Sequence, residues 1–143
     1  MADNTNIQWI YPPGFDGLYG SEAVGNRRII LQCSSVSDGT GESDVVKINR
    51  SELQCITGAT PSKLTVDEIK YRIQGMGLTI EWDSDPDERI AYFEADDVDS
   101  GCQTFMGGKT PTEDGGTGDI KFTTSGAGSG DSYDITITVR LKE

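Results

Sequence analysis

Four carboxylates between residues 83 and 94 have the spacing of a calcium-binding loop. Asp83, Asp85, Asp87 and Glu94 stand at positions 1, 3, 5 and 12 of that pattern. The sixth position, where the sharp turn needs glycine, is Glu88. We therefore expect a solvated hairpin tip, in which Asp83, Asp85 and Asp87 are the candidate ligands of a weak calcium site. No other cofactor is expected.

Catalytic patterns are weak elsewhere in the chain. Paired carboxylates can hydrolyse a glycosidic bond, and Glu81, Asp83 and Glu94 are the candidates, but any acidic surface supplies such pairs. The chain has no histidine, the most usual general base. Residues 107–110, Gly-Gly-Lys-Thr, lack the first glycine of a phosphate-binding loop, and Pro111 follows where a helix should begin. We predict that the protein is not an enzyme.

Aromatic residues gather near the start of the chain. Trp9, Tyr11, Phe15 and Tyr19 lie in residues 1–25, where prolines and glycines disfavour a long regular element. One interpretation is an irregular arm that folds back over its own domain. The other is an arm that docks on a neighbouring subunit, because tryptophan and tyrosine are frequent interface anchors.

The composition bounds the class of protein. A chain of 143 residues fits one domain, and 24 acidic against 12 basic residues give a net charge of −12. Such a charge disfavours binding to nucleic acid or to an anionic membrane surface. Cys33, Cys55 and Cys102 form no CxxC pair, which predicts neither a zinc site nor a disulfide framework and favours a reducing compartment.

The end of the chain alternates strictly between apolar and polar residues. This period of two predicts a β-strand with one dry face and one wet face. The apolar positions are Tyr133, Ile135, Ile137, Val139 and Leu141. A Gly-rich turn at 125–130 precedes this strand.

Similar but shorter patterns recur along residues 26–143. Strands are predicted around 29–33, 45–48, 69–73, 78–82, 90–93 and 120–122, with 83–87 as a hairpin loop. Loops are predicted at 34–43, 51–60 and 106–118. The expected fold is therefore all-β: an antiparallel β-sandwich of about eight strands, either jelly-roll or Ig-like, over 26–143, preceded by an N-terminal arm over 1–25.

Several of these segments resemble a family of small structural proteins of tailed bacteriophages, notably marine and cyanobacterial ones. The similarity covers roughly residues 44–143 and involves strands and turns rather than catalytic motifs. The segments are 46–53, 69–75, 80–83, 115–124 and 131–141.

The resemblance implies a virion component, specifically a capsid decoration or cement protein on the outer capsid surface, made in the host cytoplasm. Its implied partners are the major capsid protein, neighbouring copies of itself in a homo-trimer, or both. Two alternatives stay open. One is another virion part, such as a neck, tail or fibre-base module, and the other is a binding module for glycans or calcium-bridged ligands. A sugar site would use Trp9 or Trp82, although Trp82 continues an apolar strand face.

Overall fold

The computed structural model describes residues 4–11, 28–53, 60–94, 97–111 and 116–142. These residues form nine strands and one short 3-10 helix, η1, at Arg50–Glu52. The strands are β1 (Asn4–Tyr11), β2 (Arg28–Asp38), β3 (Val45–Ile48), β4 (Lys63–Gln74), β5 (Gly77–Trp82), β6 (Glu88–Glu94), β7 (Val98–Lys109), β8 (Ile120–Ser125) and β9 (Ser129–Lys142). No helix among the described residues is long and apolar enough to cross a membrane.

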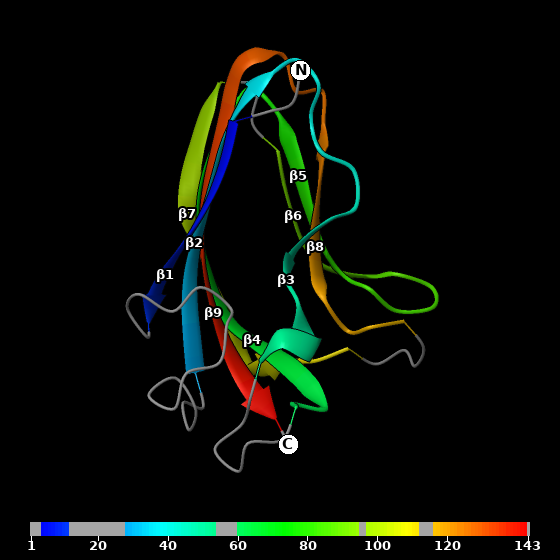
Figure 1. Ribbon diagram of the computed structural model, residues 1–143. Coiled ribbons are helices and arrows are strands. Elements are labelled where there is room, and N and C mark those ends of the chain that lie inside the picture. The colour runs from blue at the N-terminus through cyan, green and yellow to red at the C-terminus, as the bar shows by residue number, and fades with distance from the viewer. Residues whose placement is uncertain (1–3, 12–27, 54–59, 95–96, 112–115, 143) are drawn as a thin grey trace.

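The strands form two antiparallel sheets that face each other as two layers (Figure 1). The five-stranded sheet has the order β1-β2-β9-β4-β7, and the four-stranded sheet has the order β3-β8-β5-β6. The predicted all-β sandwich is confirmed, with nine strands where about eight were expected.

The pairing of β2 to β9 identifies the sandwich as a jelly roll. β5 pairs with β6, β4 with β7, β3 with β8 and β2 with β9, so the strands nest like one long hairpin. Rolling up this hairpin sets β4 beside β9 and β5 beside β8. An immunoglobulin-like domain, the other predicted sandwich, orders its strands differently. β1 adds an extra strand beside β2.

The core lies between the two sheets and follows the predicted alternation. In β9, Tyr133, Ile135, Ile137 and Val139 are buried and Leu141 is partly buried against them. Tyr133 meets the ring of Phe122 from the opposite sheet edge-on, at 5.7 Å between ring centroids. Burial of these side chains is the main stabilising contribution to such a fold.

Three predictions about the strands were wrong. Residues 4–11 of the expected irregular arm form β1, which pairs with β2 over most of its length. β2 continues to Asp38, five residues into the expected loop at 34–43. β7 was missed, and it includes residues 106–109 of the expected loop at 106–118.

Candidate functional site

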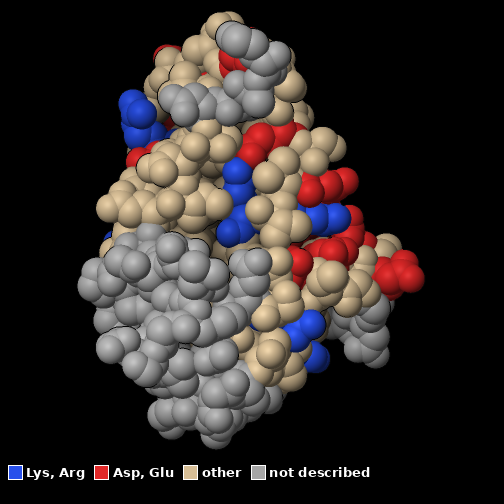
Figure 2. All heavy atoms as spheres, in the orientation of Figure 1, with Lys and Arg blue, Asp and Glu red and all other residues tan. Residues whose placement is uncertain are grey.

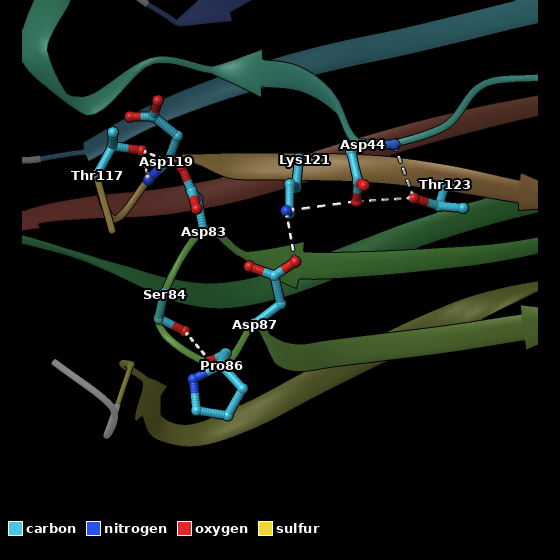
Figure 3. A network of polar contacts seen from close by, with 9 residues as sticks. All are labelled: Asp44, Asp83, Ser84, Pro86, Asp87, Thr117, Asp119, Lys121 and Thr123. Atoms are coloured by element: carbon cyan, nitrogen blue, oxygen red, sulfur yellow. Dashed lines mark hydrogen bonds and ion pairs between the residues drawn. The ribbon is translucent and has the colours of Figure 1, made fainter. Parts of the chain in front are cut away.

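The hairpin loop between β5 and β6 holds the predicted calcium ligands, and Asp83 begins it. The Asp83 backbone N–H donates to the Asp119 carbonyl at 2.8 Å, and its own carbonyl accepts from Gly118 N–H at 2.8 Å. Its carboxylate accepts from the Thr117 hydroxyl at 2.7 Å. Asp83 therefore makes three hydrogen bonds to residues 117–119, the segment that leads into β8 (Figure 3).

Gly116 permits this close contact. A Cβ atom added there would lie 2.4 Å from the Asp83 carbonyl oxygen, and the backbone has a φ of +72°. Both observations require glycine, since other residues would clash and rarely adopt that φ. The loop before β8 is thus shaped to fit the hairpin loop.

Asp87, at the other end of the hairpin loop, is bound to a lysine. Lys121 Nζ lies 2.5 Å from Asp87 Oδ2 and 3.3 Å from Asp44 Oδ1. The hydrogen bond to Asp87 raises the pKa of Lys121 above its ordinary value, although desolvation acts in the opposite direction. The Asp44 backbone N–H donates to the Thr123 hydroxyl at 2.9 Å, which fixes Asp44 beside β8 (Figure 3).

The structure therefore separates the three predicted ligands. Ligand oxygens of Asp87, Asp44 and Glu81 lie within 4.8 Å of one another, and this group includes neither Asp83 nor Asp85. The Lys121 ammonium already contacts two of its three carboxylates. The Lys121 ammonium thus gives these carboxylates the positive charge that a divalent cation would otherwise supply.

A second polar cluster is buried inside the jelly roll. Lys47 Nζ contacts Glu42 Oε2 at 2.5 Å, and both side chains are at least nine-tenths buried. The Tyr133 hydroxyl donates to the other Glu42 oxygen. Lys47 also lies 5.8 Å from the centre of the Phe122 ring. The cluster joins the segment before β3 to the central strand β9, and its two charged side chains are largely removed from solvent.

A shallow cavity of about 480 Å³ opens on the outer face of the five-stranded sheet. Two of its lining side chains are apolar, four are charged with both signs, and one is a threonine. They are Ile30 and Phe105, then Arg28, Asp67, Glu68 and Arg140, and finally Thr138. The Arg140 Nε donates to both Asp67 oxygens, at 2.8 and 2.9 Å. That guanidinium is already paired, and Arg28, the other arginine of the lining, lies 3.8 Å from the same Asp67 carboxylate.

The outer strand β1 of the five-stranded sheet is an accessible surface feature. β1 carries no charged residue, and Thr5, Asn6, Ile7, Gln8 and Ile10 all have exposed side chains. Ile7 and Ile10 are 40% and 43% exposed. In Figure 2, acidic and basic side chains gather on the side of the four-stranded sheet. A partner could approach the β1 edge without first removing water from charged groups of that strand.

The predicted arm residues lie partly outside the described part of the chain. Trp9 and Tyr11 belong to β1, where their backbones pair with Leu31 and Ile30. Phe15 and Tyr19 lie outside the described residues. Trp82, the alternative sugar-binding residue, is fully buried in the core and presents no ring surface to a ligand.

Sequence reasoning missed Asp44, Lys121 and the Glu42–Lys47 pair. Lys121 alternates with Ile120 and Phe122, which marks it as an outward residue of a strand but does not indicate its partner. Lys47 and Glu42 look like ordinary surface charges in the sequence. Only the folded chain shows that they point inward and meet.

Comparison of the chain with family models, with curated proteins and with solved structures finds no match.

Proposed function

We propose that this protein is a structural component of a tailed-bacteriophage virion, most specifically a decoration or cement protein that binds the outer capsid surface. The observation that carries the proposal is the β1 edge. It is an uncharged strand with exposed Ile7 and Ile10 that also contains Trp9 and Tyr11. An open edge strand can join a neighbour's sheet through backbone hydrogen bonds, while aromatic residues anchor the contact.

The fold is compatible with this role by analogy. Jelly rolls recur in viral capsid proteins and in lectins, so the topology favours a binding or structural module without choosing between them. Resemblance of segments within 44–143 to phage structural proteins favours the virion. Nothing in the proposed role requires catalysis.

The net charge of −12 also supports an outer position. A protein facing packaged DNA would meet strong repulsion at this charge, whereas a protein on the outside of the shell would not. The proposed mechanism is stabilisation by mass action. The protein binds the assembled lattice and not its separated subunits, so each bound copy shifts the equilibrium toward the intact shell.

A neck or tail position is the second candidate within the virion, and it differs in copy number and symmetry. A glycan-binding module is favoured only by the jelly-roll analogy, because Trp82 is buried. These candidates can be distinguished by where the chain lies on a particle.

Cryo-electron microscopy of the phage particle that encodes this chain tests the proposal. We expect copies on every capsomer of the icosahedral lattice, with β1 at the capsid contact. Density at a single vertex would replace the decoration role with a neck or tail role. Absence from the particle would overturn the virion proposal altogether.

A further inference from the structure

The described residues form four edge strands, which differ in how they are protected against pairing. Natural proteins protect sheet edges with charges, short strands and inward-pointing lysines. In the four-stranded sheet, β6 carries Glu88, Arg89 and Glu94, while β3 has only four residues and an inward-pointing Lys47. Both edges of that sheet are therefore protected.

β7 has little protection of this kind. It is twelve residues long, and its only charged residues are Asp99 and Lys109, near its two ends. Residues 100–108 are uncharged in a chain with 24 acidic and 12 basic residues. Among the described residues, β7 pairs with β4 on one side and with no strand on the other. Val98 is 48% exposed, and Met106 is fully exposed.

We propose that β7 pairs with β7 of a second copy of this chain, about a two-fold axis perpendicular to the sheet. Neighbours in the five-stranded sheet are all antiparallel, so β1 and β7 point in the same direction. Head-to-tail joining of β7 to the partner's β1 would give a parallel pair. Joining equal edges gives an antiparallel pair, which is slightly more stable per residue and closes as a dimer.

Charge also favours β7 as the place where two copies meet. Each copy carries a net charge of −12, so any contact between charged faces sets like charges against one another. The uncharged centre of β7 allows the backbones to approach without a like-charged pair. The second copy is thus the occupant that this edge fits.

The regular part of β7 sets the register. Val98–Thr104 pair with β4 without interruption, and the bulge that follows contains Gly107 and Gly108 at positive φ. With the axis at Cys102, Cys102 faces the partner's Cys102, and Ser100 faces the partner's Thr104. The exposed apolar residues Val98 and Met106 lie on either side of this regular centre.

This register makes Cys102 a reporter of the dimer. Cys102 is exposed, and opposed residues of an antiparallel pair have Cα atoms about 4.5–5.5 Å apart, within the span of a disulfide. The contact itself is small, so we expect weak association that strengthens with protein concentration and with salt, which screens the repulsion between copies. The inference does not depend on the proposed virion role.

Disulfide trapping tests the register. Diamide would accept the two electrons and two protons released when two thiols join. We expect wild type and Cys55→Ser to give a covalent dimer, and Cys102→Ser to give none. In the Cys102→Ser background, Thr104→Cys should also give none, because the partner's Ser100 lies opposite. Equal trapping at 102 and 104, or no trapping at 102, would overturn the register.

Analytical ultracentrifugation of the reduced protein tests the edge itself. Thr104→Lys and Gln8→Lys add the same charge to exposed positions on β7 and β1. At high protein concentration and about 0.5 M salt, where screening is strong, wild type and Gln8→Lys should show the mass of a dimer in part of the population. Thr104→Lys should abolish it. A strictly monomeric wild type, or loss of the dimer only in Gln8→Lys, would overturn the proposal.

Discussion

Glu42, Lys47 and Tyr133 bring a carboxylate, an ammonium group and a phenol into contact between the two sheets. Removing two charges from water costs several kcal/mol per ion, and their mutual attraction offsets this only where the geometry is good. The Tyr133 hydroxyl helps by hydrogen-bonding the second Glu42 oxygen. The cluster is therefore sensitive to the loss of one partner and much less sensitive to the loss of both charges.

Comparison of a single variant with a double variant measures this difference. Lys47→Met should lower the free energy of unfolding by about 3–5 kcal/mol, because Glu42 stays buried without its counter-ion. Adding Glu42→Gln should recover part of that loss, since the amide is neutral and its oxygen can still accept from Tyr133. Urea unfolding followed by the fluorescence of the buried Trp82 gives both values. A double variant as unstable as the single one would contradict this account.

The matched control for that comparison is a surface pair. Lys70 Nζ lies 3.8 Å from Glu68 Oε1, and the Lys70 side chain is 65% exposed. Lys70→Met should change the free energy of unfolding by no more than about 0.5–1 kcal/mol, the range of exposed ion pairs.

The buried thiol of Cys33 predicts how stability depends on pH at the alkaline end. Burial raises the pKa of Cys33 from 9.0 to about 12, while the nearby Lys47 charge acts in the opposite direction. Between these values the unfolded chain loses the thiol proton and the folded chain keeps it, so stability falls as the pH rises through this window. Urea unfolding at pH 8 and pH 10 should show a smaller decrease for Cys33→Ala than for wild type. Equal decreases would show that this thiol makes no contribution.

The two faces of β9 predict opposite outcomes for the same substitution at adjacent positions. Ile135 is fully buried between the sheets, so Ile135→Asp should prevent folding or cost more than about 3 kcal/mol. Thr136 lies on the outer face and is half-buried, so Thr136→Asp should cost about 1 kcal/mol or less. Circular dichroism during thermal unfolding distinguishes the two. A folded Ile135→Asp variant would contradict the assignment of the buried face.

At the scale of the elements, Lys121 joins three of them. It projects from β8 and contacts Asp87 just before β6 and Asp44 just before β3. Lys121→Met should therefore loosen the hairpin loop and the start of β3 together, with a loss of about 1–2 kcal/mol because charge-assisted bonds are lost and Asp44 is already well solvated. Faster amide exchange in both segments would follow, while exchange in β9 should change little.

The same lysine decides the calcium prediction. In wild type, Lys121 already neutralises part of the Asp44, Glu81 and Asp87 group, so millimolar Ca²⁺ should leave the melting temperature unchanged. Mg²⁺ at equal ionic strength controls for screening. A rise in melting temperature with Ca²⁺ alone would show that the hairpin loop binds this ion despite the lysine.

The strands that the sequence predicted best are those with one buried and one solvated face. β9, β5 and the start of β2 alternate because one side of each faces the opposite sheet. β7 does not alternate, because it lies at the edge of the wider sheet and is exposed over most of its length. Periodicity records burial, so a strand exposed on both faces leaves no such signal.

The polar contacts were less predictable than the strands. Lys121 and Asp87 are 34 residues apart, and Tyr133 and Glu42 are 91 residues apart. The jelly roll brings them together because it pairs strands from the two ends of the chain. The spacing of Asp83, Asp85 and Asp87 suggested a shared site, but the loop turns Asp83 toward Thr117 and Asp87 toward Lys121.

At the scale of the whole molecule, the two sheets have different tasks. The four-stranded sheet has protected edges, whereas both outer strands of the five-stranded sheet are long, exposed and nearly uncharged. Under the proposals above, β1 contacts the capsid and β7 contacts a second copy. One rigid body could then link a lattice site to its neighbour, which is what a cement protein requires.

Removal of the N-terminal segment tests this division of tasks. Deleting residues 2–20 removes β1, whose described side chains are exposed, and leaves the eight strands of the jelly roll with β2 still paired to β9. We expect the far-ultraviolet circular dichroism to retain its β signature, the melting temperature to fall by only a few degrees, and binding to capsids to be lost. Dimer trapping through Cys102 should persist, because β7 is unchanged.

A full-length variant distinguishes the effect of losing the β1 strand from the effect of losing its aromatic side chains. Trp9→Ala with Tyr11→Ala keeps the β1 backbone, whose pairing with β2 does not require those side chains. If the aromatic residues anchor the contact, this variant should bind capsids at least tenfold more weakly, a loss of about 1.4 kcal/mol or more. Saturation of capsids by the truncated protein would rule out β1 as the contact. If the truncated protein binds weakly but the full-length aromatic variant binds as wild type does, the β1 backbone makes the contact. The aromatic side chains would then be dispensable.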